Sequence, residues 1–289
     1  MKPYQLLEQK YAQFVGSKYA ISCSSGTAAL HLGLLSLGVS KGDEVIIPDF
    51  TMAACGFAVS YCGATPIFID CDNSLCMNWE LIESKITKKT KAIMAVHIYG
   101  RLCNMKEILR IAKKHKLFVI EDACEAQGAV YKSKADITCY SFYENKIIHA
   151  EEGGICTTDN KAYAEKIAYL KNMAFDKSHS YFHTDIGYNY RMANSQARLA
   201  LESLKNYPKE SKRRRAIERR FYGYCDHDAV WVLDYVLPEG HETMTGEPYY
   251  NEPNKRPFFK PLSSFPMYGG KCQSPKAKWY SERGHYIKL

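Results

Sequence analysis

The sequence predicts an α/β protein with a mostly parallel central sheet covered by helices on both faces, followed by a smaller C-terminal α+β unit. Between residues 20 and 156, short runs rich in β-branched residues alternate with longer helical patterns, which is typical of layered α/β domains. The short runs are nearly all apolar, as expected for strands that are covered on both faces. The chain of 289 residues, 46% apolar and 24% charged, has the composition of a globular protein with a substantial core.

Six short runs are expected to be strands of the sheet. The first, residues 19–22, precedes a helix that runs to Gly38. The clearest helix is NMKEILRIAKKHK, where Asn104 and Glu107 have the spacing of a capping box. It joins two strand candidates, as a crossover helix should. The remaining strand candidates are residues 44–48, 65–70, 91–99, 117–122 and 137–142.

Two helical patterns, residues 162–173 and 195–207, follow the last of these strands. Pro208 and the basic stretch KRRRAIERR come next, and we place the start of a second, smaller unit there. The expected division is residues 1–205 for the large unit and 206–289 for the small one. Residues 229–238 read as a strand, whereas the remainder is rich in Pro, Gly and Tyr with little periodicity and is expected to be mainly loop.

Charge and cysteine usage exclude several classes of protein. The 39 Lys and Arg residues against 31 Asp and Glu give a net charge of +8, which favours an anionic partner. The basic run 212–215 lies at helical spacing near Glu210 and Glu218, which indicates a solvated helix face and no nucleic-acid binding. No secretory signal or spanning apolar run is visible. Eleven scattered cysteines without a CxxC pair indicate free buried thiols, no metal site, and a soluble cytoplasmic protein.

The segment SCSSGTAAL could bind a phosphate group. It places Ser24, Ser25, Gly26 and Thr27 between a strand and a helix, where backbone N–H groups and the helix dipole attract anions. By itself, the pattern is weak evidence and better fits a Ser/Thr-capped helix with a glycine turn.

Two ionisable residues stand at the ends of strand candidates. Asp122 closes the apolar run LFVIED, and Lys146 follows ITCYSF, whose Ser141 lies five residues before the lysine. Open α/β sheets bind their ligands at the carboxyl ends of the strands, and a lysine near a buried strand can become a usable amine nucleophile. Taken singly, Asp122 could be a helix cap and Lys146 an exposed loop lysine.

In combination, these features meet the needs of a pyridoxal phosphate site. The cofactor requires a phosphate anchor, a lysine that forms the Schiff base, and an anion beside the pyridinium nitrogen that keeps the ring an electron sink. The candidate residues provide all three in chain order.

At these residues the sequence resembles the DegT/DnrJ/StrS nucleotide-sugar aminotransferases, which are fold-type I pyridoxal phosphate enzymes. Within this family it looks most similar to the perosamine synthase type, which aminates C4 of a nucleotide-linked 4-keto-6-deoxy sugar. Nine segments carry the resemblance in order: SSGTAAL, GDEVIIPDFTMAA, YCGATPIFID, AVHIYG, VIEDACEAQGA, SFYENKI, EEGG, IGYNYRMANSQA and RPFFKPLSSFPMY.

The resemblance implies a role for each matched residue. Lys146 falls at the position of the Schiff-base lysine, and Asp122 at that of the pyridinium partner. Gly26, Thr27 and Ser141 would hold the cofactor phosphate, and Glu125 would lie near the ring oxygen or the incoming substrate. Asn189 would reach the cofactor phosphate of a neighbouring subunit in a homodimer with shared sites, and Arg256 and Lys260 would contact the nucleotide-sugar. Glutamate is the expected amino donor.

The sequence also departs from the family pattern. Met52 stands where members usually carry an aromatic residue stacked on the cofactor ring, and a thioether orients a ring less firmly. Both ends and two loops look shortened. One alternative is therefore a truncated, non-catalytic relative that serves as a binding or assembly subunit. Another keeps the cofactor but catalyses sugar dehydration; related 3-dehydratases carry His where Lys146 stands, so the lysine favours transamination.

Overall fold

The structure, a computed structural model, describes residues 1–175, 181–238 and 254–289. The first elements are α1 (Pro3–Val15), β1 (Tyr19–Cys23), α2 (Gly26–Ser36), β2 (Glu44–Pro48), α3 (Ala53–Tyr61), β3 (Thr65–Ile69), η1 (Trp79–Leu81), α4 (Ile82–Lys85), β4 (Thr90–Val96), η2 (Ile98–Gly100) and α5 (Met105–His115). They are followed by β5 (Phe118–Asp122), β6 (Ile137–Ser141), β7 (Gly154–Thr158), α6 (Lys161–Leu170), α7 (Asn194–Tyr222), β8 (Val232–Val236), β9 (Lys255–Pro257), η4 (Leu262–Ser264), η5 (Pro266–Tyr268), α8 (Pro275–Arg283) and β10 (Gly284–Lys288).

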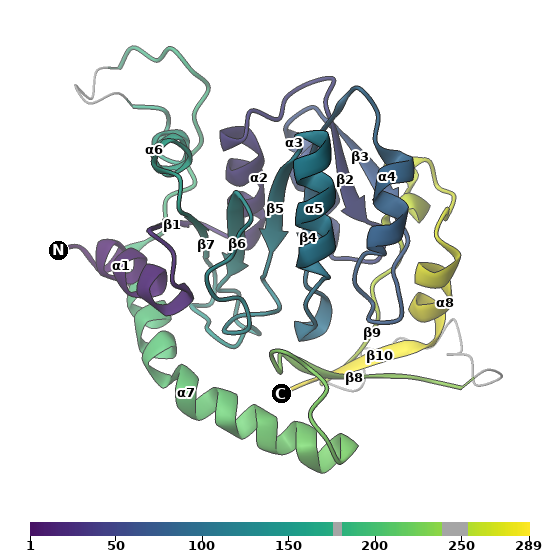
Figure 1. Ribbon diagram of the computed structural model, residues 1–289. Coiled ribbons are helices and arrows are strands. Elements are labelled where there is room, and N and C mark those ends of the chain that lie inside the picture. The colour runs from purple at the N-terminus through teal and green to yellow at the C-terminus, as the bar shows by residue number, and fades with distance from the viewer. Residues whose placement is uncertain (176–180, 239–253) are drawn as a thin grey trace.

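A seven-stranded sheet in the order β1-β7-β6-β5-β4-β2-β3 forms the centre of the protein (Figure 1). The pairs β2–β3, β2–β4, β4–β5 and β5–β6 are parallel, whereas β7 runs antiparallel to both of its neighbours. The expected mostly parallel α/β sheet is thus confirmed. Because the parallel strands end at one edge, the residues that follow β4, β5 and β6 come together there.

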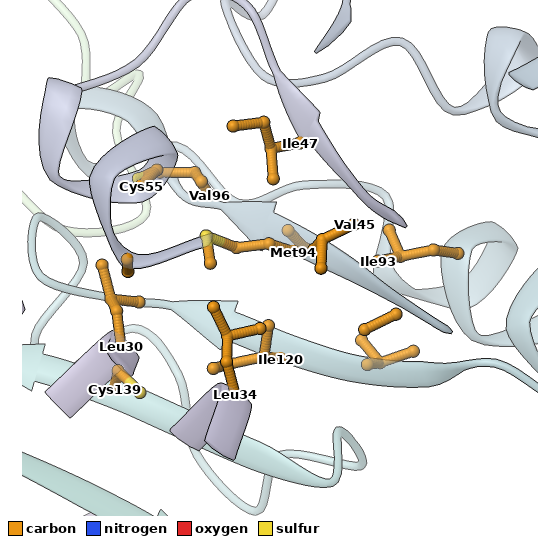
Figure 2. Close-up of a cluster of buried hydrophobic side chains, with 14 of the residues drawn as sticks. Leu30, Leu34, Val45, Ile47, Cys55, Ile93, Met94, Val96, Ile120 and Cys139 are labelled. Carbon is orange, nitrogen blue, oxygen red and sulfur yellow. The ribbon is translucent and has the colours of Figure 1, made fainter. Parts of the chain in front are cut away.

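Helices cover both faces of this sheet. In Figure 1, α5 crosses in front of the strands, and α2 and α3 lie behind them. Leu30 and Leu34 of α2 face Ile120 of β5 and Cys139 of β6 in the buried cluster of Figure 2. At Gly33 the contact is so close that an added Cβ would lie 2.8 Å from Cδ1 of Ile120. This close packing fixes the N-terminus of α2 against the carboxyl edge of the sheet.

Most of the strands and helices predicted from the sequence are present, with ends that differ by a few residues. The side chain of Asn104 accepts a hydrogen bond from the N–H of Glu107, as a helix cap should. β7, which the sequence pattern does not predict, is a fully buried strand. All eleven cysteines are free, in agreement with the prediction, and most of them are buried.

The C-terminal part differs more from expectation. α7 continues through Pro208 as one 29-residue helix, so it is longer than the helical pattern expected for residues 195–207; a proline inside a helix removes one backbone hydrogen bond without having to end the helix. β8, β9 and β10 form a separate three-stranded antiparallel sheet. The region expected to be loop therefore contains α8, β9 and β10, while residues 239–253 lie outside the described ranges. The division at residues 205 and 206 stays a prediction.

The basic run on α7 is only partly a solvated face. The side chain of Arg214 is 7% exposed and points inward, where it donates hydrogen bonds to the carbonyl oxygens of Trp231 (2.6 Å) and Leu289 (3.3 Å). Glu210 accepts hydrogen bonds from Arg213 and Arg214 at 2.7 Å each. Arg214 thus ties the long helix to the strand segment that leads into β8.

Candidate active site

A pocket of about 360 Å³ opens at the carboxyl edge of the large sheet. It is lined by eight of the residues that the sequence singled out: Ser25, Gly26, Thr27, Met52, Asp122, Glu125, Ser141 and Lys146. These residues lie on different segments of the chain, and the parallel topology brings them together. A larger cavity of about 780 Å³ lies beside the pocket and shares Asn145, Lys146 and Trp231 with it.

The N-terminus of α2 forms one end of the pocket. Ser25 caps the helix by accepting a hydrogen bond from the N–H of Ala28 at 3.1 Å. The N–H groups of Gly26 and Thr27, in the first turn, have no acceptor within the helix. The hydroxyl of Ser141 accepts a hydrogen bond from the N–H of Tyr143 at 3.2 Å, so its own proton can be donated elsewhere. Backbone and hydroxyl donors therefore converge on the space beside the helix end.

Glycine is required at the start of this helix. A Cβ on Gly26 would lie 2.8 Å from Cβ of Ser141 and 3.2 Å from Sγ of Cys124. One on Gly154, at the start of β7, would lie 2.2 Å from the carbonyl oxygen of Ser25. The donors are thus held in place by backbone segments in direct contact, and a side chain at either position would push them apart.

Asp122 is buried at the end of β5, and hydrogen bonds hold its carboxylate in one orientation. Its Oδ1 accepts the N–H of Cys124 at 3.0 Å, and its Oδ2 accepts the S–H of Cys55 at 3.2 Å. Burial and the nearby carboxylate raise the pKa of the Cys55 thiol well above its ordinary value, so the thiol keeps the proton that it donates. Cys55 also lies 3.2 Å from the hydroxyl of Thr51. This arrangement presents a fixed carboxylate to the pocket.

Lys146 reaches the pocket from the loop after β6. Its side chain is 11% exposed, and Nζ lies 3.7 Å from Oε1 of Glu125. On another side, Nζ lies 3.8 Å from the centre of the Trp231 ring. The amine therefore lies between a carboxylate and an aromatic face, in contact with the same cavity as Asp122.

Glu125 is buried next to Lys146. Burial raises the pKa of its carboxyl to about 7, although the Lys146 ammonium and the N–H of Tyr99 both act to lower it. The N–H of Tyr99 donates to Oε2 of Glu125 at 2.9 Å. Tyr99 has a left-handed φ of 51°, which is strained for a side chain of its size. At neutral pH, Glu125 can therefore exchange a proton with groups in the pocket.

The other predicted site residues lie around the pocket or outside it. Met52 is 55% exposed at the pocket mouth. Asn189 is exposed outside the pocket and pairs with Asn172 in an isolated bridge. Arg256 and Lys260 do not line the pocket, but Arg256 pairs in register with Tyr286, which does. The roles suggested for these four residues stay predictions.

Several pocket residues are absent from the sequence-based prediction. Trp231, Phe259 and Tyr286 come from the C-terminal part of the chain, and Thr51 lies just before α3. Cys55, in the first turn of α3, does not line the pocket and acts on it through its hydrogen bond to Asp122. Burial raises the pKa of Tyr286 to about 12, with Glu125 adding to this effect and Arg256 opposing it. No local pattern marks the aromatic residues as site residues, because their position depends on how the small sheet packs against the large one.

Within the described ranges, no group of three or more His, Cys, Asp or Glu side chains could hold a metal ion. In the same part of the chain, no helix is long and apolar enough to cross a membrane.

Comparison with known proteins identifies relatives of this chain. It is 38% identical over 292 residues to GDP-perosamine synthase from Escherichia coli O157:H7 (93% of this chain, 79% of the relative). It is 42% identical over 245 residues to the enzyme of that name from Caulobacter vibrioides (83% and 65%). For the Vibrio cholerae enzyme, the identity is 34% over 303 residues (96% and 83%). The chain thus spans about two thirds to four fifths of the length of these relatives.

Solved structures share the fold. DesV from S. venezuelae superposes with a TM-score of 0.89 at 24% identity, covering 100% of this chain and 84% of that one. NtdA from Bacillus subtilis, solved with bound cofactor PMP, has a TM-score of 0.82 at 27% identity (100% and 73%). Residues 2–223 match the DegT/DnrJ/EryC1/StrS aminotransferase family. This match covers more than three quarters of the protein, and the chain therefore belongs to that family.

Proposed function

We propose that this protein is a pyridoxal phosphate-dependent aminotransferase that moves an amino group from glutamate to a nucleotide-linked 4-keto-6-deoxy sugar, as a perosamine synthase does. The observation that carries the proposal is that Lys146, Asp122 and the N-terminus of α2 all face one pocket. The names of the relatives from three bacteria support the sugar substrate.

The described residues fit the cofactor. The N–H groups of Gly26 and Thr27 and the hydroxyl of Ser141 would hold its phosphate, aided by the dipole of α2. Asp122 would accept a hydrogen bond from the ring nitrogen and keep it protonated, since both carboxylate oxygens are held in place by Cys55 and Cys124. When bound, pyridoxal phosphate supplies an electron sink for the negative charge that develops at Cα of the amino donor.

Lys146 would first anchor the cofactor covalently and then act on protons. Its neutral Nζ would take the proton from Cα of the donor as a general base. Oε1 of Glu125, 3.7 Å away, stabilises the ammonium that this step produces. Because burial brings the pKa of Glu125 to about 7, this carboxyl is partly ionised at neutral pH. The aromatic residues Trp231, Phe259 and Tyr286 in the pocket wall would lower the local polarity and strengthen these interactions.

The finer assignments belong to the same proposal. Arg256 and Lys260 would contact the nucleotide-sugar, and Met52 would contact the cofactor ring. Asn189, exposed on the segment before α7, would serve the site of a second copy in a homodimer. We place the enzyme in the cytoplasm, where its free thiols stay reduced.

Neither alternative gains support. A non-catalytic relative needs no intact set of site residues, yet Lys146, Asp122 and the helix N-terminus line a single pocket here. The relatives compared above are named as synthases of an amino sugar, which does not favour a dehydratase.

Reductive trapping tests the proposal. The protein is incubated with pyridoxal phosphate, reduced with borohydride and digested, and the modified peptide is identified by mass spectrometry. We expect one modified residue, Lys146, absent in Lys146→Arg and retained in the control Lys134→Arg, which changes an exposed lysine. In a second sample, loaded with the cofactor but not reduced, added glutamate should be converted to one equivalent of 2-oxoglutarate. Modification at other lysines only, with no 2-oxoglutarate, would refute the proposal.

If that step succeeds, the sugar substrate can be identified. The aminated enzyme is mixed with GDP-, UDP- and dTDP-linked 4-keto-6-deoxy sugars, and the amino sugar is measured in a single turnover. We expect the GDP-linked 4-keto-6-deoxymannose to react fastest. A dehydrated product in place of an amino sugar would favour the dehydratase alternative.

A further inference from the structure

Trp231 has a position that the proposed function does not explain. It precedes β8 in the small sheet, yet its side chain reaches the loop that follows β6 of the large sheet, and the residue is 3% exposed. Nζ of Lys146 lies 3.8 Å from the ring centre, well within the range of a cation–π interaction. The indole Nε1–H donates a hydrogen bond to the carbonyl oxygen of Asn145 at 2.8 Å. Trp231 thus contacts both the backbone and the amine of the lysine segment.

The segment that carries Trp231 is held on several sides. Arg214 of α7 donates to its carbonyl oxygen at 2.6 Å. Two residues earlier, the N–H of Ala229 donates to the carbonyl oxygen of Gly100 at 2.9 Å. Gly100 has a φ of +89°, and an added Cβ there would lie 1.7 Å from the carbonyl oxygen of Ala229. The indole ring is therefore placed by a rigid backbone and not by its own packing alone.

Trp231 and Lys146 also separate two spaces. Together with Asn145 they line both the 360 Å³ pocket and the neighbouring cavity of about 780 Å³. A flexible lysine side chain could extend toward either space. Contacts with the aromatic face of Trp231 and with Oε1 of Glu125, 3.7 Å from the amine, hold it at the wall that the two spaces share.

We propose that Trp231 is a positioning residue for Lys146, whose protonated amine it holds against the indole face at the wall of the pocket. The attraction of an ammonium to the ring face is electrostatic, so the contact favours the charged amine over the neutral one. In the reaction, this would stabilise the ammonium formed when Lys146 takes the Cα proton. That consequence rests on the proposed function, whereas the contact itself does not.

A purely structural role for Trp231 makes a different prediction. A buried indole that only fills space would, when removed, lower stability and increase access to Lys146. Greater access raises the reactivity of the amine at every pH. Loss of a cation–π contact raises it chiefly at low pH, where the amine is mostly protonated. The pH profile of Lys146 reactivity therefore distinguishes the two roles.

Other groups near Lys146 also influence that profile. On the pocket side, these titratable groups are Asp122, Cys124, Glu125, Tyr143, Glu152 and Tyr286. In the larger cavity they are Glu144, His149, Glu151, Glu202, Glu210, Arg214 and Lys288. All remain unchanged in the variants below, so their contribution cancels in the comparison.

The test measures acetylation of Lys146 in the cofactor-free protein. Lys146 and an added reference amine compete for a trace of acetic anhydride at pH 8 and at pH 10. Mass spectrometry gives the rate of acetylation of Lys146 relative to that of the reference amine. The variants are Trp231→Leu, Trp231→Met, whose unbranched side chain has a similar volume to leucine but is longer, and Trp231→Phe, which keeps an aromatic face but lacks the indole N–H. Trp279→Leu is the control. The guanidinium of Arg283 lies 5.1 Å from the centre of the Trp279 ring, and Trp279 lines a different cavity.

We expect the ratio of the rate at pH 8 to that at pH 10 to rise about tenfold in the Leu and Met variants. It should rise by no more than about threefold in Trp231→Phe and stay unchanged in Trp279→Leu. Circular dichroism identifies the variants that are folded, and either aliphatic variant suffices. An unchanged ratio in a folded aliphatic variant would overturn the proposal, even if both rates increase.

The two proposals can fail separately. The acetylation ratio requires no cofactor, so a change in Trp231→Leu supports the positioning role even if pyridoxal phosphate never joins Lys146. Conversely, trapping of the cofactor at Lys146 with an unchanged ratio would leave the proposed function intact and refute the role of Trp231.

Discussion

Replacement of Glu125 by glutamine should change how the stability of the protein depends on pH. The wild-type carboxyl is buried, and its pKa in the folded protein is about 7, against an ordinary value of 4.5. The unfolded chain therefore loses this proton at lower pH than the folded protein. Between about pH 4.5 and 7 the folded state binds more protons, so its stability falls as pH rises. The glutamine side chain of the variant cannot ionise and removes this dependence, while its amide oxygen can still accept the N–H of Tyr99.

The magnitude follows from the two pKa values. The difference between the two pKa values lowers the free energy of unfolding by about 0.8 kcal/mol at pH 5 and by about 3.4 kcal/mol at pH 8. Relative to wild type, Glu125→Gln should therefore gain about 2.5 kcal/mol in unfolding free energy between pH 5 and pH 8. Loss of the carboxylate beside Lys146 also changes the unfolding free energy of the variant at each pH. Much of that change is common to pH 5 and pH 8 and cancels when the two free energies are subtracted.

Urea unfolding of the cofactor-free proteins at the two pH values, followed by circular dichroism, measures this quantity. Glu152→Gln is the matched control, because Glu152 lines the same pocket but is exposed, and its difference should be near zero. A difference below about 0.5 kcal/mol for Glu125→Gln, or one of opposite sign, would refute the argument that burial keeps this carboxyl neutral.

Three further substitutions test the geometry of the site. Gly26→Ala places a methyl group 2.8 Å from Cβ of Ser141, so we expect at least roughly tenfold weaker binding of pyridoxal phosphate in an absorbance titration; unchanged binding would contradict the phosphate role of the helix end. Cys55→Ala removes the S–H donor to Asp122 and should weaken binding by about three- to tenfold, with Cys55→Ser recovering part of it; equal affinities of the two variants would refute the role of the donor. Gly100→Ala places a Cβ 1.7 Å from the carbonyl oxygen of Ala229 at a residue with a φ of +89°, and it should lower the free energy of urea unfolding by about 3 kcal/mol or more. A loss below about 1 kcal/mol would show that the backbone there can adjust.

The central sheet and the residues at its edge could be predicted because their signals are local. Parallel strands buried on both faces are nearly continuous apolar runs, and the ends of those runs identified Asp122 and Ser141. β7 escapes prediction because its sequence, GICTT, is short and contains a glycine and two threonines. Its place in the sheet comes from pairing with β1 and β6, which no local pattern reveals.

The remaining differences have long-range causes. β10 pairs with β8 across about fifty residues, so the tail shows no strand signal of its own. Helical spacing places Arg214 on a solvated face, but the carbonyl oxygens that it binds belong to Trp231 and Leu289. Trp231 reaches Lys146 over 85 positions of sequence. Such contacts depend on how two sheets pack, which periodicity does not encode.

The close backbone packing at the N-terminus of α2 matters for protein engineering. Because Gly26 and Gly154 pack closely against Ser141 and Ser25, few substitutions there would be tolerated in a mutant library, and most would disturb the proposed phosphate site. The opposite wall, with Met52 at the mouth and Tyr286 on the small sheet, consists of side chains that can be exchanged with less disturbance of the main chain. Libraries that seek acceptance of new keto substrates would therefore do best to randomise that wall and keep the glycines fixed.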